Sequence, residues 1–108
     1  MRRGDLVTVA LPGDFGKPRP ALVIQSDLFA GHATVTVLPV TSTVTPAPLF
    51  RIPVEPSADN GLRETSFAML DKAMSIRAEK LGIPFGRLGD ADLIRVNRAL
   101  ALFLGIVS

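Results

Sequence analysis

The sequence contains no cysteine, a single histidine and no long apolar run, and each absence removes a class of protein. Without cysteine there can be neither disulfide bonds nor a thiolate metal site, so a reducing compartment is expected. No apolar stretch approaches the ~20 residues that span a bilayer. The N-terminus, Met1-Arg2-Arg3-Gly4-Asp5, lacks the apolar core of a signal peptide. We therefore expect a cytoplasmic protein with no membrane partner.

The single histidine, His32, is poorly suited to catalysis. It lies between Gly31 and Ala33, a context typical of a surface turn. Histidine, aspartate and glutamate are nowhere grouped at metal-ligand spacing, and no glycine-rich phosphate loop precedes a helix. With no cysteine and only one histidine, the chain also offers no good candidate for a nucleophilic triad. We therefore expect no metal and no other cofactor, so that any catalysis must rest on Arg, Asp, Glu, Ser and Thr.

What the chain does have is an excess of apolar residues and a set of cations dominated by arginine. Its 108 residues fit a single domain, residues 1–108, of which 47% are hydrophobic, with a mean hydropathy of +0.35. A small domain has much surface for its volume, so this excess favours a homodimer. Nine of the 12 cations are arginine, whose planar fork of donors matches phosphate. A net charge of +2 is too small to establish a nucleic-acid partner by itself.

Hydrophobic periodicity predicts several short strands followed by one helix. Continuous or alternating apolar runs indicate strands at residues 6–11, 21–25, 33–38, 49–54, 66–70 and 74–76. Later in the chain, apolar side chains recur every three or four residues, which predicts a helix over residues 90–104. We expect Asp90 to cap this helix, Asp92 to complement its dipole and Gly105 to end it. The pattern is that of an α+β, mostly β fold, a barrel followed by a helix.

Four segments resemble the PemK/MazF toxin family, in the order in which that family has them. The first runs from the Gly4-Asp5 pair through a loop to the Arg19-Pro20 dipeptide and a buried strand. The second, VLPVTS at residues 37–42, is an apolar strand that ends in Pro-x-Thr. The third, LDKAMSI at residues 70–76, has an aspartate shortly before a short strand, and the fourth is the C-terminal helix. Together they cover nearly the whole chain.

The resemblance implies a twisted antiparallel sheet, or SH3-like barrel, with a C-terminal helix, as in CcdB/MazF-like proteins. It also implies the toxin of a type II toxin–antitoxin system: a homodimeric endoribonuclease that cuts single-stranded RNA and is restrained by a cognate antitoxin. Arg19 and Thr41 match the two positions assigned to catalysis in the family, and Asp71 and Asp5 match acidic positions implicated in some members. The expected substrate contacts are Asp5, Lys17, Ser42 and Arg77.

The chain departs from the family at two positions. Some members carry a histidine in the loop after the first strand, and residues 12–17 contain none. Some members carry an arginine two residues before the acidic position of the third segment, where this chain has Met69.

Arg19 also has a physical case of its own. Pro18 and Pro20 stiffen the backbone around it, so its guanidinium would lose little entropy on meeting a phosphate. Arginine stays protonated in proteins, which favours stabilisation of charge on phosphate oxygens over proton transfer. Family accounts also give it acid/base duty, and the sequence leaves that choice open. Without the resemblance, a surface arginine in a proline turn would be the better interpretation.

The other candidates have structural interpretations beside the functional ones. Thr41 could position the reacting groups through its hydroxyl, or be an ordinary threonine at a strand end. Asp71 could orient Arg19 or accept a proton, or it could form an ion pair, for example with Arg77. For Asp5 a structural pair with a nearby arginine is the favoured interpretation.

An RNA substrate would bring its own nucleophile to a chain so poor in catalytic groups. Attack of the 2′-hydroxyl on the adjacent phosphorus leaves a 2′,3′-cyclic phosphate and a 5′-hydroxyl. DNA lacks this hydroxyl and cannot react in the same way. This chemistry explains how the chain could be an enzyme without a metal or a well-placed histidine.

Two other functions are compatible with the sequence. A CcdB-like poison of a topoisomerase (gyrase) acts through its C-terminal residues, and Gly105-Ile106 weakly allows this, although Val107 and Ser108 extend beyond them. A non-catalytic SH3-like module that binds protein or nucleic acid is the second alternative. Replacing Arg19 by alanine separates these, because it should inactivate a ribonuclease and leave a topoisomerase poison largely active.

Overall fold

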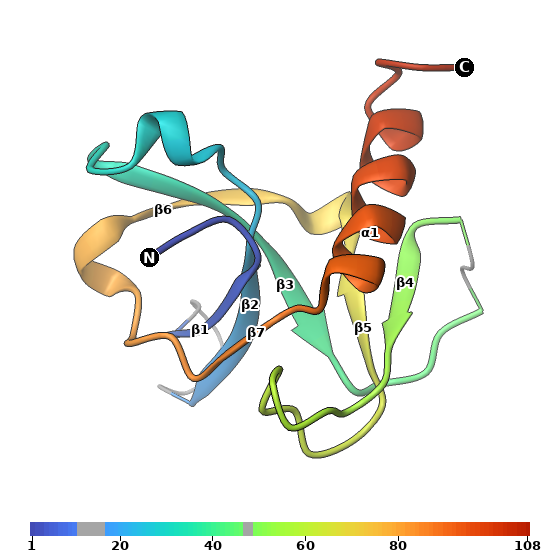
Figure 1. Cartoon of the computed structure of the whole chain (residues 1–108), viewed down its shortest axis with the longest axis horizontal. Coiled ribbons are helices and arrows are strands. Elements are labelled where there is room, and N and C mark those ends of the chain that lie inside the picture. The colour runs from blue at the N-terminus through green and yellow to red at the C-terminus, as the bar shows by residue number, and fades with distance from the viewer. Residues whose placement is uncertain (11–16, 47–48) are drawn as a thin grey trace.

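The computed structural model describes residues 1–10, 17–46 and 49–108. Within these ranges the chain forms seven strands, three short 3-10 helices and one α-helix (Figure 1). The strands are β1 Asp5–Ala10, β2 Pro18–Val23, β3 Thr34–Thr41, β4 Arg51–Val54, β5 Ser66–Met69, β6 Met74–Arg77 and β7 Gly86–Arg87. The helices are η1 Asp27–Phe29, η2 Leu70–Lys72, η3 Ala78–Lys80 and the α-helix α1 Asp90–Phe103.

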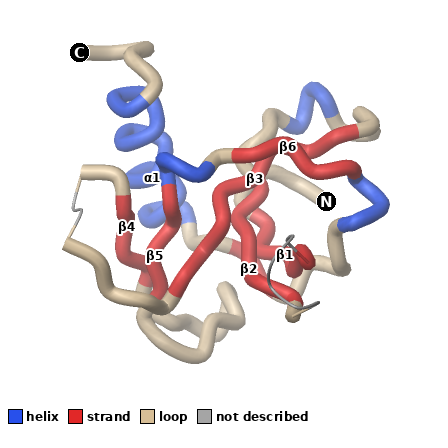
Figure 2. The backbone as a smooth tube through the Cα atoms, turned by 180° about the vertical axis from the view of Figure 1, so that it is seen from behind, coloured by secondary structure: helices blue, strands red, loops and turns tan. Residues whose placement is uncertain are grey.

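The long strand β3 lies at the centre of the antiparallel sheet. Its one edge pairs with β2, and its other edge pairs first with β6 and then with β5. The sheet order is β4-β5-β3-β2-β1-β7, with β6 also on β3. The sheet curls into a half-barrel, and α1 lies beside β4 and β5, as Figures 1 and 2 show from opposite sides. This confirms the predicted antiparallel sheet with one C-terminal helix.

Apolar side chains of the same strands form two separate clusters, because alternate residues of a strand point to opposite faces. The larger cluster packs under α1, whose Val96 and Leu100 are buried in it. From the sheet it includes Leu6, Leu22, Leu38, Val40, Ile52, Val54 and Ala68, and from η2 it includes Leu70. The smaller cluster consists of Val7, Val9, Ala21, Val23 and Val37. We call the face that carries the smaller cluster, turned away from α1, the distal face.

The strand β2 begins three residues earlier than the sequence predicts. Pro18 and Pro20 pair with β1, whereas the ladder with β3 starts only at Ala21. A proline has no N–H to donate, so residues 18–20 can be held from one side only. As a result Arg19 lies on a strand, at the end of the sheet, rather than in the proline turn considered above.

The helix α1 matches the predicted range closely, but its cap differs. Gly89, with extended backbone angles, occupies the capping position, and its carbonyl accepts the first helical hydrogen bond from the Leu93 N–H at 2.9 Å. The predicted cap by Asp90 is therefore wrong, since Asp90 is already helical. At the other end Gly105 adopts a φ of 76° and closes the helix as predicted. In the described ranges no helix has both the length and the apolar character needed to cross a membrane.

Candidate active site

Arg19 of β2 and Thr41 of β3 lie on the same face of the sheet. The ladder between these two strands ends at the pair Ala21–Pro39, so each residue lies two positions beyond the last pair on its own strand. Because every second side chain of a strand points to the same face, both side chains point to the distal face at this end of the sheet. Arg19 is exposed and Thr41 is half-buried. The two residues matched to the catalytic positions of the family thus share one face at one end of the sheet.

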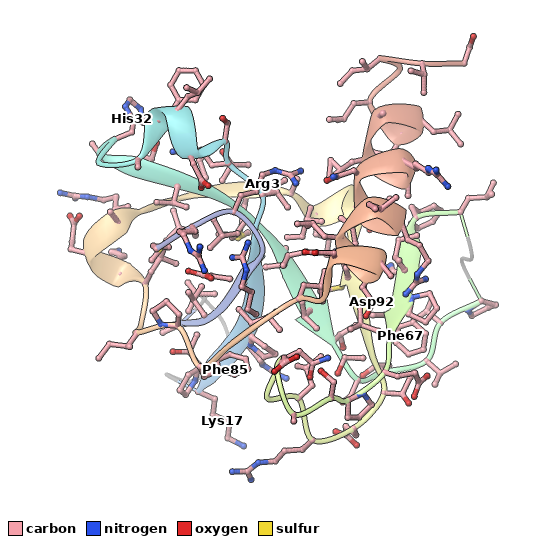
Figure 3. The ribbon with its side chains drawn as sticks, viewed as in Figure 1. Arg3, Lys17, His32, Phe67, Phe85 and Asp92 are labelled. Atoms are coloured by element: carbon pink, nitrogen blue, oxygen red, sulfur yellow. The ribbon has the colours of Figure 1, made fainter. Side chains whose placement is uncertain are left out.

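The hydroxyl of Thr41 is oriented by the turn that follows β3. The backbone N–H of Thr43 donates to Thr41 Oγ1 at 3.1 Å. A hydroxyl has one proton and two acceptor lone pairs, so this bond occupies a lone pair and leaves the proton to be donated elsewhere. Ser42 is exposed in the same turn, and Lys17 is exposed immediately before β2 (Figure 3). Both therefore lie near the Arg19–Thr41 end of the sheet.

Asp71 lies in η2, at the border of this region, and forms an ion pair with Arg51. Its Oδ2 lies 3.3 Å from Arg51 Nη2, with the two side chains 30% and 13% exposed. Arg51 also stacks over the ring of Phe50, 5.9 Å from its centroid. Its Nε is buried and has no hydrogen-bond partner among the described residues. The ion-pair interpretation of Asp71 is supported, with Arg51 rather than Arg77 as the partner.

Sequence reasoning missed Arg51. On the distal face, Arg51 lies two residues further along the strands than Thr41. Arg51 pairs in register with Met69 of β5, and Met69 follows Phe67, the β5 partner of Thr41, by two residues. The pairing of β4 with β5 alone brings Arg51 to Asp71, 20 residues later in the chain. Nothing in the local sequence around either residue signals this contact.

Asp5 is buried and has a structural role in the sheet. Its Oδ1 accepts from Arg87 Nη1 at 3.0 Å, and its Oδ2 accepts from the backbone N–H of Arg2 at 2.8 Å. Asp5 lies four residues along β1 from Val9, which pairs with Arg19. This separation is about 13 Å in a strand, so the sheet does not bring Asp5 to Arg19.

Arg77 and His32 lie at the opposite end of β3. Arg77 pairs in register with Thr34, seven residues and about 23 Å from Thr41. Its Nε lies 2.9 Å from Glu79 Oε1, and both side chains are largely exposed. His32 is exposed shortly before β3, far from Lys17 in Figure 3. The structure therefore does not place Arg77 with Arg19 and Thr41, and it places His32 after a turn, as predicted.

In the part of the chain that the structure describes, no three His, Asp or Glu side chains gather as metal ligands would.

A curled antiparallel half-barrel with one C-terminal helix is the CcdB/MazF-like fold. The Mycobacterium tuberculosis toxin MazF-mt6 has this fold, with a TM-score of 0.78 and 26% identity over 94% of this chain and 96% of its own. An endoribonuclease from a mycobacterial species, solved with its cognate antitoxin, also shares the fold, with a TM-score of 0.79 and 23% identity over 97% of this chain and 93% of its own.

Residues 2–104 match the family described as the PemK-like, MazF-like toxin of type II toxin–antitoxin systems. A probable endoribonuclease MazF of Mycolicibacterium smegmatis is 48% identical over 107 residues, which cover 98% of each chain. Endoribonuclease MazF9 of Mycobacterium tuberculosis is 31% identical over 118 aligned positions, covering 100% of this chain and 99% of the relative. The chain belongs to the PemK/MazF toxin family, which confirms the resemblance found in its sequence.

Proposed function

We propose that this chain is the toxin of a type II toxin–antitoxin system and cleaves single-stranded RNA through attack by the substrate's own 2′-hydroxyl. Family membership and the curated endoribonuclease relatives support ribonuclease activity over the topoisomerase-poison and binding-module alternatives. The observation that carries the choice of site is that Arg19 and Thr41 share the distal face, each two residues beyond the last pair of the β2–β3 ladder.

The reaction assigns one task to each side chain. The O2′–P bond forms and the P–O5′ bond breaks, while a proton leaves O2′ and another reaches O5′. Negative charge accumulates on the non-bridging phosphate oxygens, where the Arg19 guanidinium can donate two parallel hydrogen bonds. Thr41 Oγ1 accepts a hydrogen bond from the Thr43 N–H, so the proton of the Thr41 hydroxyl remains available to donate to the same phosphate oxygens. Asp71 acts indirectly, because its ion pair holds Arg51 at the border of the site.

Primer extension on a mixed RNA incubated with the protein in EDTA tests the proposal. We expect discrete cuts in single-stranded segments, with 2′,3′-cyclic phosphate ends, and no loss of activity in the chelator. A 2′-deoxy nucleotide at the mapped cut site should stop cleavage at that site. Cleavage of the 2′-deoxy substrate, or a requirement for added metal, would contradict the mechanism.

The homodimer is part of the same proposal, with α1 and the residues after it as the contact surface. Leu102, Leu104, Ile106 and Val107 are all more than half exposed, a costly arrangement for a monomer. Leu104 and Ile106 border a groove of about 330 Å³ that Arg3 and Ile24 also line. A second copy of the chain would cover both features.

Light scattering at micromolar concentration tests the dimer. We expect a species of about 23 kDa, twice the 11.5 kDa of the chain. Leu104→Glu, at a position 58% exposed, should give a folded protein with the monomer mass. A wild-type protein that scatters only as a monomer would overturn this assignment.

The family also implies a cognate antitoxin, and the chemistry of the site suggests its character. An acidic, disordered segment with apolar residues would compete with RNA for the surface around Arg19. Such a toxin would act in the cytoplasm, on cellular RNA. Expression of the chain alone should slow growth, and co-expression of a small neighbouring reading frame should restore it; unimpaired growth without that partner would count against the toxin assignment.

A further inference from the structure

Phe67 is an aromatic residue that the described hydrophobic clusters do not use. Its neighbours on β5, Ser66 and Ala68, are buried, and Ala68 belongs to the cluster under α1. Phe67 points to the opposite, distal face, where it is only half-buried. Among the described residues it is a member of neither cluster. The core therefore does not account for a phenylalanine at this position.

The register of the sheet sets Phe67 directly beside Thr41. Thr41 and Phe67 are paired residues of β3 and β5, and paired residues point to the same face with Cβ atoms about 4.5–5.5 Å apart. On its other side Phe67 pairs with the exposed Pro53 of β4. The distal face thus carries a row, Thr41, Phe67 and Pro53, that runs across three strands, with Arg19 on the same face of β2.

An aromatic ring near groups that can bind phosphate forms a surface on which an unpaired nucleotide can bind. The bases of single-stranded RNA stack on exposed aromatic side chains, whereas their phosphates bind cations and hydroxyl groups. We propose that Phe67 stacks against the base of a nucleotide that flanks the scissile phosphate, and so positions the RNA on Arg19 and Thr41. The inference rests on the proposed function and adds a base-binding residue to it.

Stacking on Phe67 would contribute affinity and position rather than the choice of sequence. Every base has a π-face, so stacking tolerates all four bases. Loss of the ring should therefore weaken binding by a similar factor for different RNAs and leave the cut sequence unchanged. This separates Phe67 from a residue that reads base edges through hydrogen bonds.

The chain offers a direct optical test, because it contains no tryptophan and no tyrosine. Phe67→Trp introduces a single fluorophore at the proposed stacking position. Titration with a short single-stranded RNA, carrying the mapped cut sequence with a 2′-deoxy nucleotide at the cut site, should quench its emission. An RNA with an abasic site at the stacking position should bind more weakly and quench less. Phe67→Tyr, which also creates the only fluorophore of its kind, serves if the larger indole is not accommodated.

Phe29→Trp is the matched control. Phe29 is 61% exposed and lies in η1, near the opposite end of β3. The same titration should leave its emission unchanged. Quenching of both tryptophan variants to the same extent would overturn the proposal, because it would report non-specific RNA binding. A Phe67→Trp variant that still binds RNA without any quenching would overturn it as well.

Phe67→Ala separates binding from folding and from dimer contacts. We expect RNA affinity to fall roughly 5- to 150-fold, so that a higher concentration of the variant is needed to reach its maximal single-turnover rate. Phe29→Ala should bind as the wild type does. If Phe67→Ala dissociates a dimer that the wild type forms, as seen by light scattering, Phe67 belongs to the subunit contact and the proposal is wrong.

The outcomes distinguish this inference from the proposed function beneath it. If the wild-type protein cuts RNA in EDTA while the Phe67→Trp variant binds RNA without quenching, the proposed ribonuclease activity is supported and only the stacking of a base on Phe67 is contradicted. If a mixed-sequence single-stranded RNA quenches the Phe67→Trp variant and the wild type cuts no RNA, base stacking is supported and the ribonuclease activity is contradicted. A wild-type protein that neither binds nor cuts RNA contradicts both proposals.

Discussion

The two ends of β3 both lie near polar and basic side chains, but the two ends differ in how these side chains are arranged, and we propose the site at only one of them. At the Thr41 end, Phe67 of β5 pairs with the threonine, and Arg19 of β2 lies on the same face, two residues beyond the last pair of the β2–β3 ladder. At the Thr34 end, Arg77 is directed to Glu79. The first arginine is held in a paired, proline-flanked strand, whereas the second ends a strand and leads into a 3-10 helix. The choice of Arg19 over Arg77 as the proposed catalytic arginine therefore rests on the residues around each arginine and not on its charge.

Replacing Arg19 should cause the largest loss of cleavage rate. Arg19→Ala removes the donor that faces the developing phosphate charge, a loss that typically costs ~2.7–4 kcal/mol or roughly 10²–10³ in rate. Arg19→Lys retains the charge but not the planar fork, so it should remain strongly impaired. Single-turnover cleavage of a short RNA measures both. Arg63→Ala, at another exposed arginine, is the matched control and should cut at the wild-type rate.

Replacing Thr41 should cost less than replacing Arg19, because a neutral hydroxyl stabilises phosphate charge less than a guanidinium. Thr41→Ala should lower the single-turnover rate by roughly tenfold, as expected for a neutral hydrogen bond of about 1 kcal/mol or slightly more. Thr41→Ser keeps the hydroxyl and the acceptor for the Thr43 N–H, so it should retain much of the activity. Equal losses in the alanine and serine variants would show that the methyl group, not the hydroxyl, matters at this position.

Replacing Asp71 should have a smaller effect, since its described partner is Arg51 rather than a residue of the row. Asp71→Asn removes the charge but keeps the shape, and a partly exposed pair of this kind contributes about 0.2–1 kcal/mol. We expect a rate within a few-fold of the wild type. If Asp71 acts through Arg51, the double variant Asp71→Asn/Arg51→Ala should be no slower than Arg51→Ala alone. Additive losses would give Asp71 a separate role in the reaction.

The sequence was sufficient for the elements and the family, because both depend on local pattern. Apolar alternation indicated the strands, three- and four-residue spacing indicated α1, and Gly105 marked its end. The missed elements are those that have little local pattern. The two-residue strand β7 is defined only by its pairing with β1, and Asp90 was taken for a cap because Gly89 has no side chain to signal one.

The candidate site could be predicted only as far as its residues lie in recognisable segments. Arg19, Thr41 and Asp71 each belong to such a segment, so the resemblance was enough to single them out. The shared face of Arg19 and Thr41, the Asp71–Arg51 pair and the place of Phe67 all depend on strand register. Register follows from the packing of whole faces and cannot be read from one strand at a time. The pairing of Arg77 with Thr34, at the other end of β3 from Thr41, could not be predicted for the same reason.

Replacing His32, which lies near the Thr34 end of β3, should have the smallest effect on the cleavage rate. His32 is exposed shortly before Thr34, and the site begins about seven residues further on, at Thr41. His32→Ala should therefore cut RNA at close to the wild-type rate. Arg77→Ala should lower RNA affinity no more than a few-fold, and the difference should shrink as salt is raised. A His32→Ala protein as inactive as Arg19→Ala would mean that histidine is an acid or base in the reaction. Within one chain the two ends of β3 are too far apart for that, so such a result would require the Thr34 end of a second copy to complete the site.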